Sequence, residues 1–184
     1  MRRVGKFASN AELVTDVGRR LIELASVEPG MDLLDVPCGA GNAAIPAAQA
    51  GARATGVDPW ADILALARER AADYMVEVDW VEAEPGELPF PDASFDRVVS
   101  VFGPGDELAT REMLRVCRPG GAIAVAMWET EPPVADAANV EHGELDWNGR
   151  AREYVLAVRP RCSSQRGCSA WWPGLGGRGS RVGV

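Results

Sequence analysis

The chain has 184 residues, a formal net charge of −8 and a hydrophobic fraction of 47%. This length favours a single domain with a full core. No apolar run reaches the roughly 18 residues that a bilayer crossing needs, and the basic start of the chain is not followed by the apolar stretch of a signal peptide. We therefore expect a cytoplasmic protein without a membrane segment.

The charge distribution indicates whether the chain could bind nucleic acid. Residues 161–184 contain four Arg and no acidic residue, so the other 160 residues carry 15 basic and 27 acidic side chains. An acidic body of this kind argues against a nucleic-acid partner. The chain has four cysteines, Cys38, Cys117, Cys162 and Cys168. Their spacing is not typical of a metal site, so we expect reduced thiols and no metal.

Helical patterns alternate with short apolar runs along most of the chain. Helices are predicted over residues 11–27, 42–50, 59–72 and 107–117. Strands are predicted over residues 31–36, 52–57, 74–81, 95–102 and 122–128, with a Pro-rich acidic loop over 82–92 and an Arg-Pro-Gly-Gly turn over 118–121. This alternation predicts an α/β fold, doubly wound around a mainly parallel sheet with helices on both faces.

The pattern weakens after residue 128. Residues 134–142 form at most a poor helix, and Asn148-Gly149 between 144–147 and 150–158 is a hairpin signal with a type I′ turn. From residue 160 onward the composition predicts disorder. We therefore divide the chain into a core (1–130), an atypical segment with a C-terminal hairpin (131–160) and a disordered tail (161–184).

The strongest functional signal lies where the first predicted strand ends. The apolar run that ends in Asp35 is followed by Val-Pro-Cys-Gly-Ala-Gly-Asn over residues 36–42 and then by an Ala-rich helical segment. A strand, a tight glycine loop and a helix start bring backbone close to a nucleotide-like ligand. The second strand ends in Asp58, the position at which a ribose diol would be held. The two features predict a cofactor site.

Two later motifs narrow this prediction. Residues 88–96 read Leu-Pro-Phe-Pro-Asp-Ala-Ser-Phe-Asp, and Arg-Pro-Gly-Gly follows at 118–121. With these motifs, residues 12–128 resemble class I S-adenosylmethionine-dependent methyltransferases of the small-molecule type. The resemblance implies a Rossmann-like sheet with strand order 3-2-1-4-5, S-adenosyl-L-methionine as cofactor, and methyl transfer to a small-molecule acceptor.

The resemblance also implies which residues hold the amino-acid end of the cofactor. Asp35, Gly39 and Gly41 match the loop beneath it, and we expect Asp35 to orient this loop through backbone N–H groups. Pro37 replaces the usual first glycine and lacks an N–H, so the neighbouring glycines must keep the turn. Cys38 belongs to the same loop and reads as a small buried apolar group. The methionine end is expected along Val101 and Phe102.

The ribose and adenine are expected at the next two loops. Asp58 matches the acid that holds the ribose hydroxyls, since a carboxylate accepts two donors. Pro59 and Trp60 are expected beside the adenine ring. Glu84 stands near the adenine amine, with Pro85 next to it. No residue is assigned as a general base, and the catalytic residues stay unassigned.

Three alternatives remain open beside this interpretation. Residues 39–44 also fit the G-x-G-x-x-A fingerprint of NAD(P)-binding proteins. Asp58 followed by Pro59 is a good N-cap for the next helix, and capping and ribose binding can both hold. The segments expected to face an acceptor are short, and the last 24 residues resemble a sequence read in an alternative frame. A truncated relative that binds the cofactor without turnover is therefore a further hypothesis.

Overall fold

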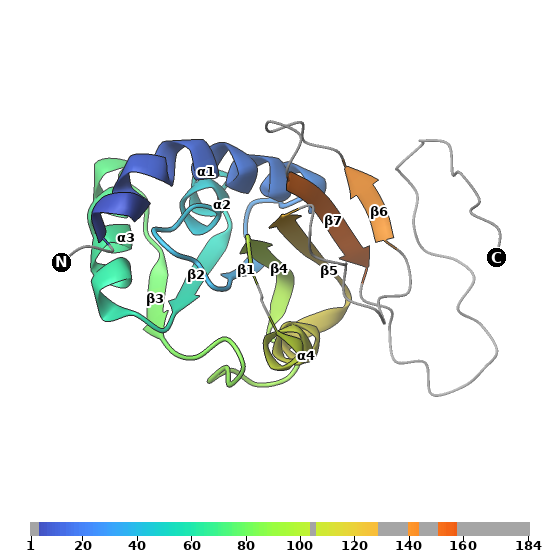
Figure 1. The fold of residues 1–184 in the computed structure, drawn as a ribbon. Coiled ribbons are helices and arrows are strands. Elements are labelled where there is room, and N and C mark those ends of the chain that lie inside the picture. The colour runs from blue at the N-terminus through green and yellow to red at the C-terminus, as the bar shows by residue number, and fades with distance from the viewer. Residues whose placement is uncertain (1–3, 104–105, 129–139, 144–150, 158–184) are drawn as a thin grey trace, which may run out of the picture.

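The computed structural model describes residues 4–103, 106–128, 140–143 and 151–157 (Figure 1). The helices in this part of the chain are α1 (Val4–Leu24), α2 (Ala44–Gln49), α3 (Ala61–Asp73) and α4 (Glu107–Val116). The strands are β1 (Asp32–Asp35), β2 (Arg53–Asp58), β3 (Asp79–Glu82), β4 (Phe95–Val101), β5 (Cys117–Trp128), β6 (Val140–Gly143) and β7 (Ala151–Ala157). None of the described helices combines the length and apolar character needed to cross a membrane.

The strands form one sheet of order β3-β2-β1-β4-β5-β7-β6. The first five in this order are parallel to their neighbours, whereas β7 runs antiparallel to both β5 and β6. This arrangement confirms the doubly wound fold and the order 3-2-1-4-5. It also places an antiparallel pair, β6 and β7, at the edge beyond β5. The predicted hairpin is of this kind, but its first strand was expected over 144–147 and is found at Val140–Gly143.

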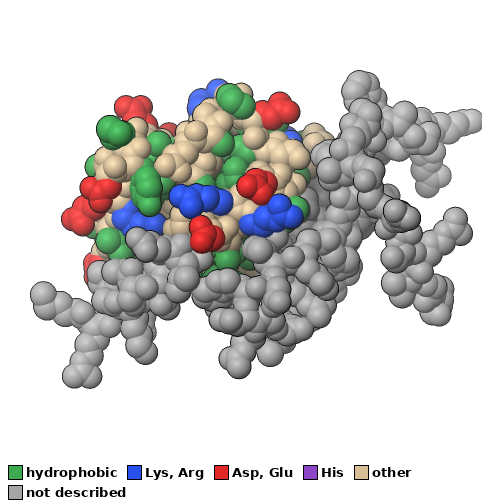
Figure 2. All heavy atoms as spheres, turned by 90° about the horizontal axis from the view of Figure 1, so that it is seen from above, with side chains coloured by type: hydrophobic (Ala, Val, Ile, Leu, Met, Phe, Trp, Pro, Cys, Tyr) green, Lys and Arg blue, Asp and Glu red, His purple; other side chains and the backbone are tan. Residues whose placement is uncertain are grey.

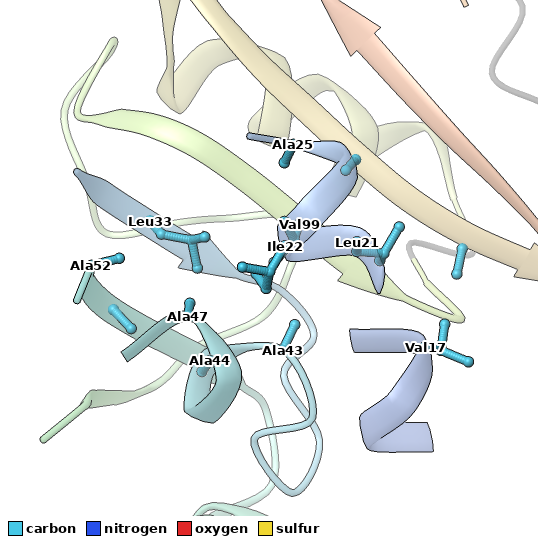
Figure 3. Packing of buried hydrophobic residues seen from close by; sticks show 13 residues of the cluster. Val17, Leu21, Ile22, Ala25, Leu33, Ala43, Ala44, Ala47, Ala52 and Val99 are labelled. Carbon is cyan, nitrogen blue, oxygen red and sulfur yellow. The ribbon is translucent and has the colours of Figure 1, made fainter. Parts of the chain in front are cut away.

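Helices cover both faces of the sheet, with α1 and α2 on one face and α4 on the other (Figure 1). On the first face, Val17 and Leu21 of α1 pack with Leu33, Ala43 and Val99 in one buried cluster (Figure 3). Because both faces are covered, the centres of β1, β4 and β5 are buried and apolar. On the outer side of α1, Arg19 pairs with Asp16 and Arg20 with Glu23, and charges of both signs are interspersed on the face seen in Figure 2.

The connection from β3 to β4, residues 83–94, contains no helix. It is held against α4 instead. The Arg115 guanidinium donates to the carbonyl oxygens of Leu88 (3.1 Å) and Phe90 (2.7 Å), and the Glu112 carboxylate accepts the N–H of Leu88 (2.8 Å). The Leu-Pro-Phe-Pro-Asp motif is therefore a loop fixed by two side chains of α4.

Charged side chains tie together the opposite, amino-terminal end of the central strands. Arg118 donates to Asp96 (2.7 Å) and to Asp32 (3.0 Å), and Arg53 donates to Asp32 (2.7 Å). These contacts join β1, β2, β4 and β5. Arg118 is 41% exposed, so each pair contributes modestly to stability, on the order of 1 kcal/mol or less.

Several element boundaries differ from the sequence prediction. Helix α1 begins at Val4 rather than at residue 11, and β3 begins at Asp79 rather than at residue 74. The late start of β3 follows from α3, which continues to Asp73 before Met75 takes a left-handed conformation (φ 56°). Strand β5 begins at Cys117, so residues 118–121 bulge out opposite Asp96 and do not form a separate turn.

The prediction of a poor helix over 134–142 is wrong for its last residues, because β6 occupies Val140–Gly143 and pairs with β7. The predicted strand over 150–158 is found as β7 (Ala151–Ala157). The predicted strand over 144–147, the Asn148-Gly149 turn and the predicted tail over 161–184 lie outside the described residues.

Gly18 sets the distance between α1 and the segment that leads into α2. A Cβ placed on Gly18 would lie 1.9 Å from the carbonyl oxygen of Asn42 and 2.6 Å from its carbonyl carbon. Backbone cannot yield in the way that the end of a flexible side chain can. The closeness of α1 to residues 42–43 therefore requires glycine at this position.

We predict that Gly18→Ala lowers the free energy of unfolding by about 1–3 kcal/mol, because α1 must move away from Asn42. A loss of stability would be diagnostic of the close approach, since Gly→Ala inside a helix otherwise raises the free energy of unfolding by about 0.5–1 kcal/mol. Urea denaturation measures the change. The exposed neighbour Arg19 provides the control, with Arg19→Ala expected within about 0.5 kcal/mol of the parent. An increase in stability for Gly18→Ala would contradict the close approach.

Candidate cofactor site

The carboxyl ends of β1, β2, β3 and β4 meet at one edge of the sheet. Strand β1 lies between β2 and β4, so the connections that follow β1 and β4 leave in opposite directions. In open parallel sheets, such a reversal of strand order opens a crevice in which ligands bind. The glycine loop, Asp58 and the segment after β3 all lie at this edge.

Asp35 is the last residue of β1 and is completely buried. Its Oδ2 accepts the N–H groups of Ala43 (3.2 Å) and Ala44 (2.8 Å), at the start of α2. Its Oδ1 has no hydrogen-bond partner among the described residues. Burial raises the pKa of Asp35 to about 7, although the two N–H donors oppose that shift. These bonds confirm that Asp35 orients the loop through backbone N–H groups.

The loop between Asp35 and α2 turns through its two glycines. Gly39 and Gly41 both have positive φ angles, 52° and 79°, which confirms that they keep the turn after Pro37. The N–H of Cys38 donates to the carbonyl oxygen of Val57 (2.8 Å), which ties the loop to β2. The Cys38 side chain is buried, as expected of a small apolar group.

Trp80 of β3 explains why two of the glycines cannot carry side chains. A Cβ on Gly41 would lie 2.7 Å from Cη2 of this indole, and one on Gly56 would lie 2.5 Å from its Cζ3. The indole therefore fills the space that side chains at these two positions would occupy. No sequence signal indicated this contact, since Trp80 is far from both glycines along the chain.

Asp58 joins the tip of β2 to the glycine loop. Its Oδ2 accepts the N–H of Gly39 (3.0 Å) and its Oδ1 accepts the N–H of Trp60 (3.1 Å). The residue is only 4% exposed, and burial together with the nearby charge of Glu84 raises its pKa, against the effect of the two donors. The capping prediction is wrong, because α3 begins at Ala61 and its N-cap is Trp60.

A cavity of about 350 Å³ opens beside these residues, on the side of α4. Its lining residues are Pro37, Glu84, Pro85, Gly86, Glu87, Asp106, Leu108 and Ala109. It thus brings together three residues of the predicted site, one from the glycine loop and two from the segment after β3.

The remaining predicted residues do not line this cavity. Trp60 is 48% exposed and Pro59 is partly buried. Val101 and Phe102 pack against the cluster beneath α1, and the N–H of Phe102 donates to Ala126 (2.8 Å). The structure therefore separates the predicted methionine-end pair from the cavity lining.

Sequence reasoning missed five of the eight lining residues: Gly86, Glu87, Asp106, Leu108 and Ala109. Asp106 has a recognisable signal, because an acid directly before a helix is a good N-cap, and its Oδ1 accepts the N–H of Ala109 (2.8 Å). Glu87, Leu108 and Ala109 carry no such signal. They reach the cavity because residues 83–94 and α4 are held together by Arg115, a contact between distant parts of the chain.

Comparison with known proteins agrees with this geometry. Residues 33–121 match the family described as a methyltransferase domain. An uncharacterised protein of Mycobacterium tuberculosis is 38% identical over 177 residues, which cover 94% of this chain and 60% of that protein. The malonyl-[acyl-carrier protein] O-methyltransferase of Serratia marcescens is 34% identical over 174 residues, 92% of this chain and 64% of that protein. The chain thus spans about six-tenths of the length of these relatives.

Among solved structures, a putative S-adenosyl-L-methionine-dependent methyltransferase of Methanococcus maripaludis superposes with a TM-score of 0.68. The superposition covers 89% of this chain and 94% of that one, at 13% identity, and at that identity it speaks for the fold alone. Residues 33–121 thus match a methyltransferase domain, and the fold has the Rossmann-like architecture of S-adenosyl-L-methionine-dependent methyltransferases. The cofactor of this class is S-adenosyl-L-methionine.

The residues at the edge of the sheet fit this cofactor. The carboxylates of Asp58 and Glu84 are acceptors, and the cofactor presents hydroxyl and amine donors to them. The lining acids Glu84, Glu87 and Asp106 also suit a ligand that carries a positive sulfonium. At Gly39 a Cβ would meet only the Asn42 side chain, at 3.6 Å, so the backbone there is less crowded than at Gly41, which Trp80 covers.

We predict a pH-dependent difference in stability between the parent and Asp35→Asn. The pKa of Asp35 is raised to about 7 in the folded state, so protonation favours folding. The parent therefore loses the contribution of this group as pH rises from about 4 to about 7, whereas the neutral amide does not titrate. Urea denaturation at pH 4, 5.5 and 7 should show the stability of the parent, relative to the variant, falling with pH. A constant difference would contradict a raised pKa.

Proposed function

We propose that this chain binds S-adenosyl-L-methionine at the carboxyl edge of the sheet and transfers the methyl group to a small-molecule acceptor. The observation that carries the proposal is the buried Asp58 carboxylate, which accepts the N–H of Gly39 from the glycine loop. One carboxylate thus orders the loop and lies at the strand tip where a diol would be recognised.

Each end of the cofactor has a matching set of residues. The carboxylate of Asp58 accepts the ribose hydroxyls, and Glu84 accepts the adenine amine, with Trp60 and Pro85 as apolar neighbours of the ring. The backbone of residues 37–41 takes the amino-acid end, and Val101 and Phe102 border the methionine side. The fixed geometry of Asp35 and Asp58 means that the loop needs little rearrangement to bind.

When bound, the cofactor supplies a methyl group on a positively charged sulfonium. The chain contributes mainly by holding the acceptor in line with that group, and orientation of this kind lowers a barrier by about 7–11 kcal/mol in favourable cases. The small-molecule acceptor rests on the resemblance over residues 88–96 and 118–121. The malonyl-[acyl-carrier protein] O-methyltransferase among the relatives supports methyl transfer in general.

We predict that the full chain binds S-adenosylhomocysteine and that Asp58→Ala weakens this binding at least about tenfold, because charged hydrogen bonds to the ribose are lost. Isothermal titration calorimetry measures both affinities, with NADH as the ligand of the competing fingerprint. Asp62→Ala is the matched control, since Asp62 is an exposed acid in the first turn of α3 and should leave the affinity unchanged.

A rise in melting temperature with S-adenosylhomocysteine would support the same conclusion. Binding of NADH in place of S-adenosylhomocysteine would overturn the proposed cofactor. Binding of S-adenosylhomocysteine without methyl transfer to any acceptor would leave a cofactor-binding relative that lacks turnover, and would overturn the enzymatic part of the proposal.

A further inference from the structure

Arg70 of α3 reaches the glycine loop from a distant part of the chain. Its guanidinium donates to the carbonyl oxygen of Ala40, to Oδ1 of Asn42 (3.1 Å) and to Oγ1 of Thr15 in α1 (2.9 Å). The Thr15 hydroxyl in turn donates to Asn42 Oδ1 (3.4 Å). One partly buried cation therefore connects α1, the glycine loop and α3.

These contacts fix the peptide between Ala40 and Gly41 at both ends. Its carbonyl oxygen accepts from Arg70, and its N–H donates to the carbonyl oxygen of Cys38 (2.9 Å). Because a peptide unit is planar, holding both ends sets the orientation of the whole plane. This matters at Ala40, because glycine on either side leaves the backbone torsions soft.

Helix α1 is part of the same assembly. Gly18 packs directly on the backbone of Asn42, one turn after Thr15, and Val17 packs with Ala43 in the cluster shown in Figure 3. The loop is thus held between α1 and Arg70. Neither element supplies a residue to the cavity lining.

We propose that Arg70 is a positioning residue, which, with Thr15, holds the Ala40–Gly41 peptide and thereby fixes the glycine loop in the conformation that receives the amino-acid end of the cofactor. This inference rests on the proposed function. The proposal predicts that removing Arg70 weakens the binding of some ligands and not of others. Ligands that carry the amino-acid part lose affinity when Arg70 is removed, whereas 5′-methylthioadenosine, which lacks that part, does not.

The test compares the binding of S-adenosylhomocysteine and 5′-methylthioadenosine to the full chain by calorimetry. For Arg70→Met we expect the affinity for S-adenosylhomocysteine to fall about ten- to a hundredfold, the range for a lost charged hydrogen bond, with the affinity for 5′-methylthioadenosine within about threefold of the parent. Arg19→Met is the matched control, because it removes an exposed guanidinium of α1 paired only with Asp16 in the described contacts and should change neither affinity.

Two further variants separate positioning from direct contact and from simple misfolding. Thr15→Val should weaken S-adenosylhomocysteine less than Arg70→Met, and the double variant should lose less than the sum, since both changes act on one network. Arg70→Lys keeps the charge but not the forked geometry, so we expect it to recover only part of the affinity. Retained binding of 5′-methylthioadenosine shows that each variant is folded.

The outcomes are distinguishable. Equal losses for both ligands would make Arg70 a structural residue of the fold and overturn the inference. Full additivity with Thr15→Val would indicate that Arg70 acts on the ligand directly, which also overturns positioning through the loop. Failure of the parent chain to bind S-adenosylhomocysteine would overturn the proposed function itself, before any variant is compared.

Discussion

The carboxylate of Asp35 holds the point at which the chain leaves β1 and enters α2. Helix α2 has only six residues, and its N-cap Ala43 offers no side-chain cap. The first N–H groups of any helix lack partners within it, and Asp35 accepts two of them from the end of the preceding strand. The eight residues between β1 and α2 (36–43) are closed by this contact, so the position of the glycine loop follows from it. Burying the carboxylate is costly, and the two donors only partly offset that cost.

Much of the fold was predictable because local pattern and final structure agree. Strands β1, β2 and β4 lie within a few residues of their expected ranges, since each has a buried apolar centre (Leu33 and Leu34, Val57, Val98 and Val99) that local pattern reveals. The loop over residues 36–42 and the acid at Asp58 were also predictable, because glycines and a carboxylate at strand ends are local features. The boundaries of β3 and β5 were less predictable from the sequence. The length of α3 and a bulge opposite Asp96 set them, and neither leaves a periodic signal.

The parts of the site that sequence could not predict depend on contacts between distant residues. Arg70 is 30 positions from Ala40, and Trp80 is 39 positions from Gly41, so neither spacing carries a pattern. The two motifs on which the resemblance rests, residues 88–96 and 118–121, take part in contacts that hold the scaffold together. Arg118 pairs with Asp96 at the amino-terminal end of the strands, and Arg115 holds the carbonyls of Leu88 and Phe90. These motif contacts are therefore scaffold interactions that set where the cavity lies, and they leave its chemistry to other residues.

The environment of Cys38 affects how readily the protein is alkylated. Its thiol lies within the glycine loop, and burial together with the charges of Asp35 and Asp58 raises its pKa well above that of a free cysteine. The thiolate is the nucleophilic form of cysteine, so a thiol held neutral in this way reacts slowly with electrophiles. A sulfonium methyl donor is an electrophile. Under the proposed function, the same acidic, desolvated surroundings keep the Cys38 thiol neutral and so protect the loop from alkylation by a bound methyl donor.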